Sequence, residues 1–178
     1  MRTVDNDKAL KMLEEAEGLK RNELLSLQTE RLKELVCIIR EGSPYFNRLY
    51  RDVPNDPVLQ DLPPVRKEDL IPSYGEWVTE RGIDRKDVLA FTEDMNAGPL
   101  YMGKYTALHT SGTTGEPMPM LRDSYHNVIH GAMLKRRLLK DAAEYMDIRK
   151  HKRAAVVFAN KGASSYNSYL RTIAANPG

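Results

Sequence analysis

Six consecutive residues combine hydroxyl groups and glycines at a density that suggests anion chemistry. They read TSGTTG and are followed by Glu116 and Pro117. Hydroxyls donate hydrogen bonds, and glycine backbone reaches positive φ, so its N–H groups can approach a ligand closely. Consecutive N–H groups form a concavity that binds anions such as phosphate. The pattern predicts either a phosphate-binding loop or a plain turn built from Thr110, Ser111, Gly112, Thr113, Thr114 and Gly115.

Three common glycine-loop patterns do not fit this segment. A P-loop needs Lys and then Ser or Thr after its second glycine, where this chain has Glu116 and Pro117. The dinucleotide-binding fingerprint needs three glycines, and only Gly112 and Gly115 are present. A KH-type loop continues into a helix, which Pro117 disfavours because it fixes φ and lacks an N–H.

The eight residues 110–117, TSGTTGEP, resemble the phosphate-binding signature of the adenylate-forming (AMP-binding) superfamily at every position. Many members have a lysine after the proline, where this chain has Met118. The branch of phenylacetate-coenzyme A ligase and the deazaflavin-cofactor (coenzyme F) synthetases often lacks that lysine. Two further segments, LQTERLKELVCIIREGSPYFNRLY and LPPVRKEDL, resemble this branch. The resemblance covers residues 19–121 well and the remainder loosely.

This resemblance implies a two-step ligase that uses ATP and Mg²⁺. A carboxylate attacks the α-phosphate to give an acyl-adenylate and pyrophosphate, and a second nucleophile, typically the coenzyme A thiol, takes the acyl group. Thr110, Ser111, Thr113 and Thr114 would donate hydroxyl hydrogen bonds to the outer phosphates, with Gly112 and Gly115 as close-approach backbone. The family's adenine, ribose and catalytic-lysine motifs are expected beyond Gly178, so we expect a fragment that is inactive alone.

The elements that must position the loop follow from periodicity and capping. We expect helices at residues 6–17, 22–41 and after Pro44, and a helical turn from Lys67. Strands are expected at 105–110 and 118–122, then a helix at 125–149 capped by Asp123 or Ser124, and a buried strand at 154–159. The fold class is α/β, with a helical lead at 1–96 and an incomplete phosphate-loop portion at 97–178.

Apolar side chains in the second helix predict a buried face. They recur at steps of three and four and comprise Leu24, Leu25, Leu32, Leu35, Val36 and Ile39. Cys37, the chain's single cysteine, lies in the same apolar run and is expected to be a small core residue. Trp77 and Tyr74 are expected to cover the edge of a core.

Several residues outside the loop suggest other chemistry. His126 and His130 have the spacing of an HExxH zinc helix, but Asn127 replaces its glutamate, so we interpret them as surface or half-buried histidines. His109 adjoins the loop and either faces a phosphate or points away as part of an alternating strand. The basic clusters at 135–140 and 149–153 could meet nucleic acid, although the second is better explained as cations at a helix C-terminus.

Composition limits the remaining possibilities. The chain has 178 residues, 41% of them hydrophobic and 29% charged, with a net charge of +2. This balance is typical of a globular protein, and the mixed charges do not favour nucleic acid as a partner. No apolar run is long enough for a membrane span, so we expect a cytoplasmic protein that binds a nucleotide and a small carboxylate. The alternative is a non-enzymatic module that binds protein or nucleic acid through its helices.

Overall fold

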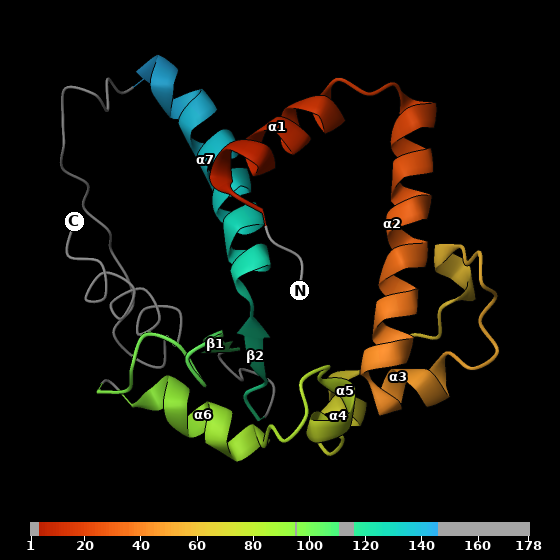
Figure 1. Cartoon of the computed structure of the whole chain (residues 1–178), viewed down its shortest axis with the longest axis vertical. Helices are drawn as coiled ribbons and strands as arrows, with labels where there is room; N and C mark the ends of the chain where they lie inside the picture. Colours follow the sequence, from red (N-terminus) through yellow and green to blue (C-terminus); the bar gives the residue numbers. More distant parts are fainter. Residues whose placement is uncertain (1–3, 95, 111–115, 146–178) are drawn as a thin grey trace. The chain divides into compact units, whose positions relative to one another are not determined.

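The computed structural model describes residues 4–94, 96–110 and 116–145, and side chains as far as residue 137. This part is mixed α/β, mostly helical with a small antiparallel sheet of two strands (Figure 1), which confirms the mixed class expected from the sequence. The elements are α1 (Asn6–Glu17), α2 (Arg21–Gly42), α3 (Pro44–Leu49), the 3-10 helix η1 (Leu59–Asp61), α4 (Lys67–Leu70), α5 (Tyr74–Trp77), α6 (Arg85–Glu93), β1 (Thr106–His109), β2 (Pro119–Arg122) and α7 (Ser124–Tyr145).

Most predicted elements are present in the described part of the chain. The helices at α1 to α4 and both strands are confirmed, whereas α5 and α6 were not predicted. The predicted strand at 154–159 and the end of the long helix lie outside the described residues. Contacts divide the chain into two compact units, residues 18–88 and residues 1–17 together with 89–178. The predicted division between residues 96 and 97 stays a prediction.

A small apolar core holds together the unit of residues 18–88. Its buried members are Val36 of α2, Tyr50 and Val53. The partly buried side chains packed against them are Leu32, Ile39, Phe46, Leu49 and Leu62. The core therefore lies on the side of α2 that carries Val36.

The predicted buried stripe of α2 is wrong for three of its six residues. Leu24, Leu25 and Leu35 are 38%, 51% and 53% exposed, whereas Val36 is 2% exposed. Successive residues of a helix point about 100° apart, so six apolar residues at these spacings occupy more than one face. The core packs against only one of those faces, and the other leucines stay at the surface.

Ser43 joins the ends of three helices in this unit. It is 1% exposed, and its Oγ accepts a hydrogen bond from the N–H of Phe46 at 3.2 Å, which caps α3. The same hydroxyl donates to the carbonyl of Glu76 in α5 at 2.9 Å. The Arg40 guanidinium donates to the carbonyls of Tyr50 and Val53. These bonds satisfy backbone groups at the start of α3, just after its end and in α5.

Tyr74 and Trp77 pack within this unit, as predicted. Tyr74 is 3% exposed, and the two rings meet edge to face with centroids 5.2 Å apart. Trp77 Nε1 donates to the carbonyl of Leu70 at 3.1 Å. Such edge contacts and a satisfied indole N–H are typical of packing aromatics.

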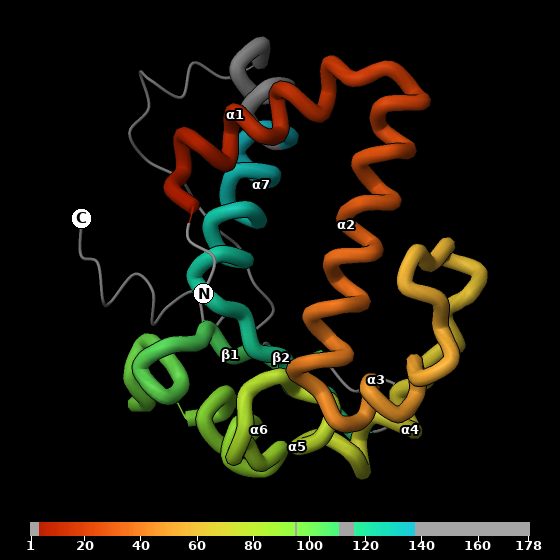
Figure 2. The backbone as a smooth tube through the Cα atoms, turned by 45° about the vertical axis from the view of Figure 1, so that its right-hand side comes forward, coloured from red at the N-terminus to blue at the C-terminus, as the bar shows by residue number. Residues whose placement is uncertain are grey.

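In the other unit, α1 packs across α7 (Figures 1 and 2). Ala9 of α1 and Ala132 of α7 are 0% and 3% exposed. Arg136 of α7 donates from Nε and Nη2 to the Glu17 carboxylate, each at 2.7 Å, and from Nη1 to Glu14 at 2.8 Å. The hydrogen bond to Glu17 is the main cause that raises the pKa of Arg136. This bidentate pairing fixes the orientation of α1 on α7.

Candidate functional site

β1 and β2 form a hairpin whose connection contains the hydroxyl-rich segment. The register pairs Thr106 with Arg122 and His109 with Pro119. One step further, the Thr110 N–H donates to the Met118 carbonyl at 3.0 Å, and the Met118 N–H donates to Thr110 Oγ1 at 3.1 Å. A side-chain oxygen thus accepts the bond from Met118. This pair closes the hairpin, and residues 111–117 form the connection.

Thr110 is the one predicted site residue in the described part of the chain. Its side chain is exposed, and its Oγ1 accepts one hydrogen bond from Met118. A threonine hydroxyl that accepts one bond still carries a proton that it can donate. The other five predicted site residues lie outside the described residues: Ser111, Gly112, Thr113, Thr114 and Gly115.

The return side of the loop is anchored in the interior of its unit. Met118 is 7% exposed, and Pro119 is among the fully buried side chains. Glu116 is exposed. Because Met118 is buried, the residue that follows Pro117 does not present its side chain to solvent.

His109 connects the strand before the loop to α6. Its Nδ1 lies 2.8 Å from Thr92 Oγ1, and the Thr92 hydroxyl donates to the carbonyl of Leu89 at 2.7 Å. Because that hydroxyl has only one proton, it accepts the bond from His109, which places a proton on Nδ1. Burial lowers the pKa of His109, and the nearby Glu93 charge raises it less strongly. Nδ1 of His109 therefore contacts α6, and the alternative that the ring faces a phosphate stays a prediction.

The start of α7 is fastened to the hairpin. Asp123 caps the helix, as predicted, because its Oδ1 accepts from the N–H of His126 at 2.7 Å. One turn later, the Asn127 amide donates to Thr106 Oγ1 of β1 at 2.8 Å. The strand before the loop, β1, is therefore tied to α6 through His109 and to α7 through Thr106.

His126 and His130 are both exposed on α7, as the sequence predicts. Their rings lie nearly parallel, at 22°, with centroids 6.1 Å apart. Burial and the positive charge of Arg122 lower the pKa of His126. No cluster of three or more His, Cys, Asp or Glu side chains that could hold a metal occurs among the described residues.

The basic cluster on α7 is only partly open to a partner. Lys135 and Arg137 are exposed, but Arg136 between them pairs with Glu14 and Glu17 of α1. The Lys140 side chain and the cluster at 149–153 lie outside the described residues. A nucleic-acid interface on this face is thus weakened by the two acidic partners of its central cation.

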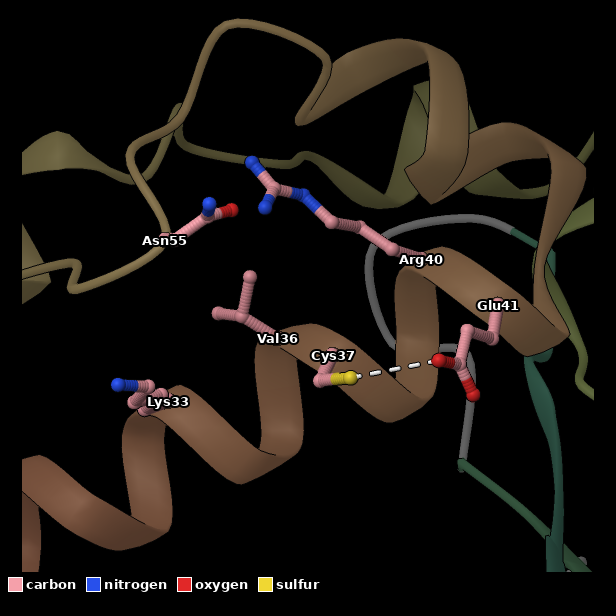
Figure 3. A pocket seen from close by; sticks show the side chains of 6 residues that line it. All are labelled: Lys33, Val36, Cys37, Arg40, Glu41 and Asn55. Atoms are coloured by element: carbon pink, nitrogen blue, oxygen red, sulfur yellow. Dashed lines mark hydrogen bonds between the residues drawn. The ribbon is translucent and has the colours of Figure 1, made fainter.

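A pocket of about 380 Å³ lies beside α2 in the unit of residues 18–88 (Figure 3). Each charged side chain that lines it has a partner within the unit. Lys33 pairs with Asp56, Arg40 donates to backbone carbonyls, and Glu41 accepts from the Cys37 thiol. The remaining lining residues are Val36 and Asn55.

The prediction that Cys37 is a core residue is wrong, because Cys37 is exposed. It follows Val36 in α2 and therefore points about 100° away from the side that the core covers. Its Sγ lies 3.4 Å from Glu41 Oε1, and this hydrogen bond raises the pKa of the thiol. A raised pKa disfavours the nucleophilic thiolate, so the residue is not suited to covalent catalysis.

Sequence reasoning missed the two residues that fasten the hairpin to its neighbouring helices. Thr92 lies in α6, which was not predicted, and only the fold brings it to His109, 17 positions along the chain. Asn127 was noted only as a departure from a zinc motif. A polar residue one turn into a helix that follows a strand is the signal that could have identified it.

No helix in the described part of the chain is both long and apolar enough to cross a membrane. Comparisons with family models, with curated proteins and with solved structures find no match. The likeness of residues 110–117 to the adenylate-forming signature therefore rests on those residues and on their place in the hairpin.

Proposed function

We propose that this chain is the N-terminal part of the large domain of an ATP-dependent adenylate-forming ligase. Such an enzyme activates a carboxylate as an acyl-adenylate and passes the acyl group on, typically to coenzyme A. The observation that carries the proposal is the complete TSGTTGEP signature at the connection between β1 and β2. The function of the loop is to hold the β- and γ-phosphates of ATP.

The chemistry of the segment suits a polyphosphate. Four hydroxyls and the backbone N–H groups are hydrogen-bond donors, and only Glu116 adds a negative charge. Phosphoryl and adenylyl transfer need positioning and electrostatic stabilisation more than covalent help from the protein. The loop residues therefore serve to orient the departing pyrophosphate while the substrate carboxylate attacks the α-phosphate.

Mg²⁺ fits this proposal as an ion held by the nucleotide. The described residues contain no cluster of acidic or histidine ligands that could form a metal cage. Mg²⁺ commonly keeps several waters and binds the phosphates of its substrate directly. When bound, Mg²⁺ would neutralise part of the negative charge of the phosphates. Met118 cannot do so, because its side chain is apolar and buried.

The anchored base of the hairpin supports the proposal, because it fixes the two ends of the connection, Thr110 and Met118, next to each other. Thr110 and Met118 close it with two hydrogen bonds, and Thr92 and Asn127 tie β1 to α6 and α7. Restricting the ends of a binding loop lowers the entropy lost on binding. Thr110 itself contributes both to this base and, through its remaining hydroxyl proton, to the phosphate.

Carboxylate-dependent exchange between ATP and pyrophosphate tests this function in the complete polypeptide that the gene encodes. Ser111→Ala and Thr114→Val should each lower the exchange rate at least tenfold. Ser26→Ala and Thr29→Val are matched controls, because both hydroxyls are exposed on α2 and, within the described part of the chain, bond only to helix carbonyls. Exchange that is unchanged by the loop variants would remove the loop from the mechanism.

A binding module without enzymatic activity is the second candidate. The exposed leucines of α2 favour it, because Leu24, Leu25 and Leu35 offer apolar surface to another protein. In that case the loop is a plain turn, and the two loop variants would leave nucleotide binding at the level of the controls. Substitution of the α2 leucines would instead weaken capture of the partner.

A further inference from the structure

The exposed histidine pair on α7 has a geometry that the proposed ligase function does not use. His126 and His130 are separated by four residues, so both lie on one side of the helix, one turn apart. The described residues provide no hydrogen-bond partner for either ring. Two exposed rings with unoccupied nitrogens on adjacent turns place two imidazole ligands within reach of one metal ion.

The observed ring separation is compatible with binding one ion between them. Histidine nitrogen binds Zn²⁺ at about 2.0–2.1 Å, so the centroid of a bound imidazole ring lies about 3.2 Å from the ion. The centroids of two rings on opposite sides of one ion are therefore at most about 6.4 Å apart. The centroids of His126 and His130 are 6.1 Å apart, with rings inclined by 22°. The two rings are stacked, so both exposed side chains must turn until one nitrogen of each ring points at the same ion.

We infer that His126 and His130 form a bidentate site for a late first-row divalent metal ion such as Zn²⁺, Ni²⁺ or Cu²⁺. Imidazole nitrogen selects these ions, whereas Mg²⁺ prefers oxygen ligands. The remaining coordination positions are filled by water, since no third metal-binding side chain joins the pair among the described residues. This site is separate from the Mg²⁺ that the proposed ligase would bind with ATP.

The charged groups around the pair set its strength. Asp123, one turn earlier, is negative but uses Oδ1 to cap the helix through the N–H of His126. Arg122 is close enough to lower the pKa of His126 by its charge, and that charge also repels a cation. We therefore expect weak binding, with Cu²⁺ bound most tightly and Ni²⁺ and Zn²⁺ more weakly, as the usual order of divalent affinities requires.

The consequence for the fold is local. A bound ion cross-links the first two turns of α7, directly after the strand that leaves the loop. Any ion that binds the folded chain and not the unfolded one raises its melting temperature with concentration. The first turn of α7 is thus stabilised by metal in addition to its Asp123 cap.

Calorimetric titration of the untagged 178-residue chain tests the inference with ZnCl₂, NiCl₂, CuCl₂ and MgCl₂ in separate arms. We expect one Zn²⁺, Ni²⁺ or Cu²⁺ per chain and no binding of Mg²⁺. In NMR spectra the imidazole signals of His126 and His130 should shift with Zn²⁺, while those of His109 stay unchanged. Absence of binding at millimolar Zn²⁺ and Cu²⁺ would overturn the proposal.

A spacing variant is the matched control. The double substitution H130A/G131H keeps the number of histidines but moves the second ring to five residues after His126, about 140° around the helix. A side chain at Gly131 meets open space, so this variant should fold. We expect its Cu²⁺ affinity to fall at least tenfold. Wild-type affinity in this variant, or in H126N/H130N, would show that the metal binds elsewhere and would refute the site.

Discussion

Replacement of Thr92 by valine tests the connection between α6 and the strand that leads into the loop. Thr92 is 0% exposed, and its hydroxyl lies 2.8 Å from His109 Nδ1 and 2.7 Å from the Leu89 carbonyl. Valine keeps the shape of the side chain and removes the hydroxyl. The His109 N–H then loses its acceptor.

The expected loss of stability is about 1–2 kcal/mol, at the lower end of the range for an unsatisfied buried group, because the His109 side chain is only partly buried. For a chain of this length that corresponds to a decrease in melting temperature of about 2–8 °C. The pKa of His109 should also fall further, because the lost acceptor stabilises the charged imidazolium more than the neutral ring.

Thermal unfolding and NMR titration of the His109 imidazole measure both effects. Thr92→Ser is the matched control, because it keeps the hydroxyl and removes only a methyl group. We expect this control to lose some stability while the pKa of His109 stays at its wild-type value. If Thr92→Val leaves both the melting temperature and the pKa of His109 unchanged, the hydrogen bond does not anchor the strand.

Three further perturbations give results that the structure specifies. Gly42→Ala should lower the free energy of unfolding by about 1–3 kcal/mol through overpacking, because the added Cβ would lie 2.9 Å from Thr79 Cγ2. In urea unfolding, a further Thr79→Ala substitution should restore part of that loss. Gly131→Ala meets open space in α7 and should add about 0.5–1 kcal/mol by the same assay; a loss would contradict the described helix. Ser43→Ala should cost about 1–2 kcal/mol through the lost cap, and a neutral result in chemical unfolding would show that the cap is unimportant.

Stability should fall as the pH drops below about 6.5, the ordinary pKa of histidine. The pKa of His109 is lowered in the folded chain, so between that lower value and the ordinary one the unfolded state binds more protons. The contribution of His109 to the free energy of unfolding is therefore fully present above this window, decreases as the pH falls through it and is absent below it. His109→Asn, which keeps a donor near Thr92, should make the pH dependence of the melting temperature less steep, and the remainder is expected from His126, whose pKa is also lowered. An equally steep profile in this variant would assign the effect to another group.

Local signals in the sequence predict the elements around the site well. Pro44 after Gly42 marks the break between α2 and α3, and Asp123 marks the start of α7, because caps and prolines act within a few residues. The β-prone residues on both sides of the TSGTTG segment correctly predict the hairpin. These features depend on neighbours in the chain and are therefore accessible without tertiary information.

Burial in α2 and the fastening of the hairpin depend on tertiary contacts and were not predictable in the same way. The apolar residues of α2 cover more than one face, and only packing of Tyr50 and Val53 selects the Val36 side. Cys37 is exposed for the same reason. The bond from His109 to Thr92 requires knowledge that α6 lies beside β1, which no local pattern supplies.

Binding of a polyphosphate by the loop is the central claim, and backbone amide NMR of the chain titrated with Mg²⁺ and ATP tests it most directly. Inorganic tripolyphosphate serves as a second ligand that lacks the nucleoside. The proposal predicts saturable shifts of the amide signals of residues 111–115 with both ligands, and weaker binding in Thr114→Val than in Thr29→Val. Two results would contradict the proposal: the amide signals of residues 111–115 do not shift at any ATP concentration up to tens of millimolar, or they do not shift while ATP saturates another surface. In either case the loop is a plain turn and the ligase proposal fails.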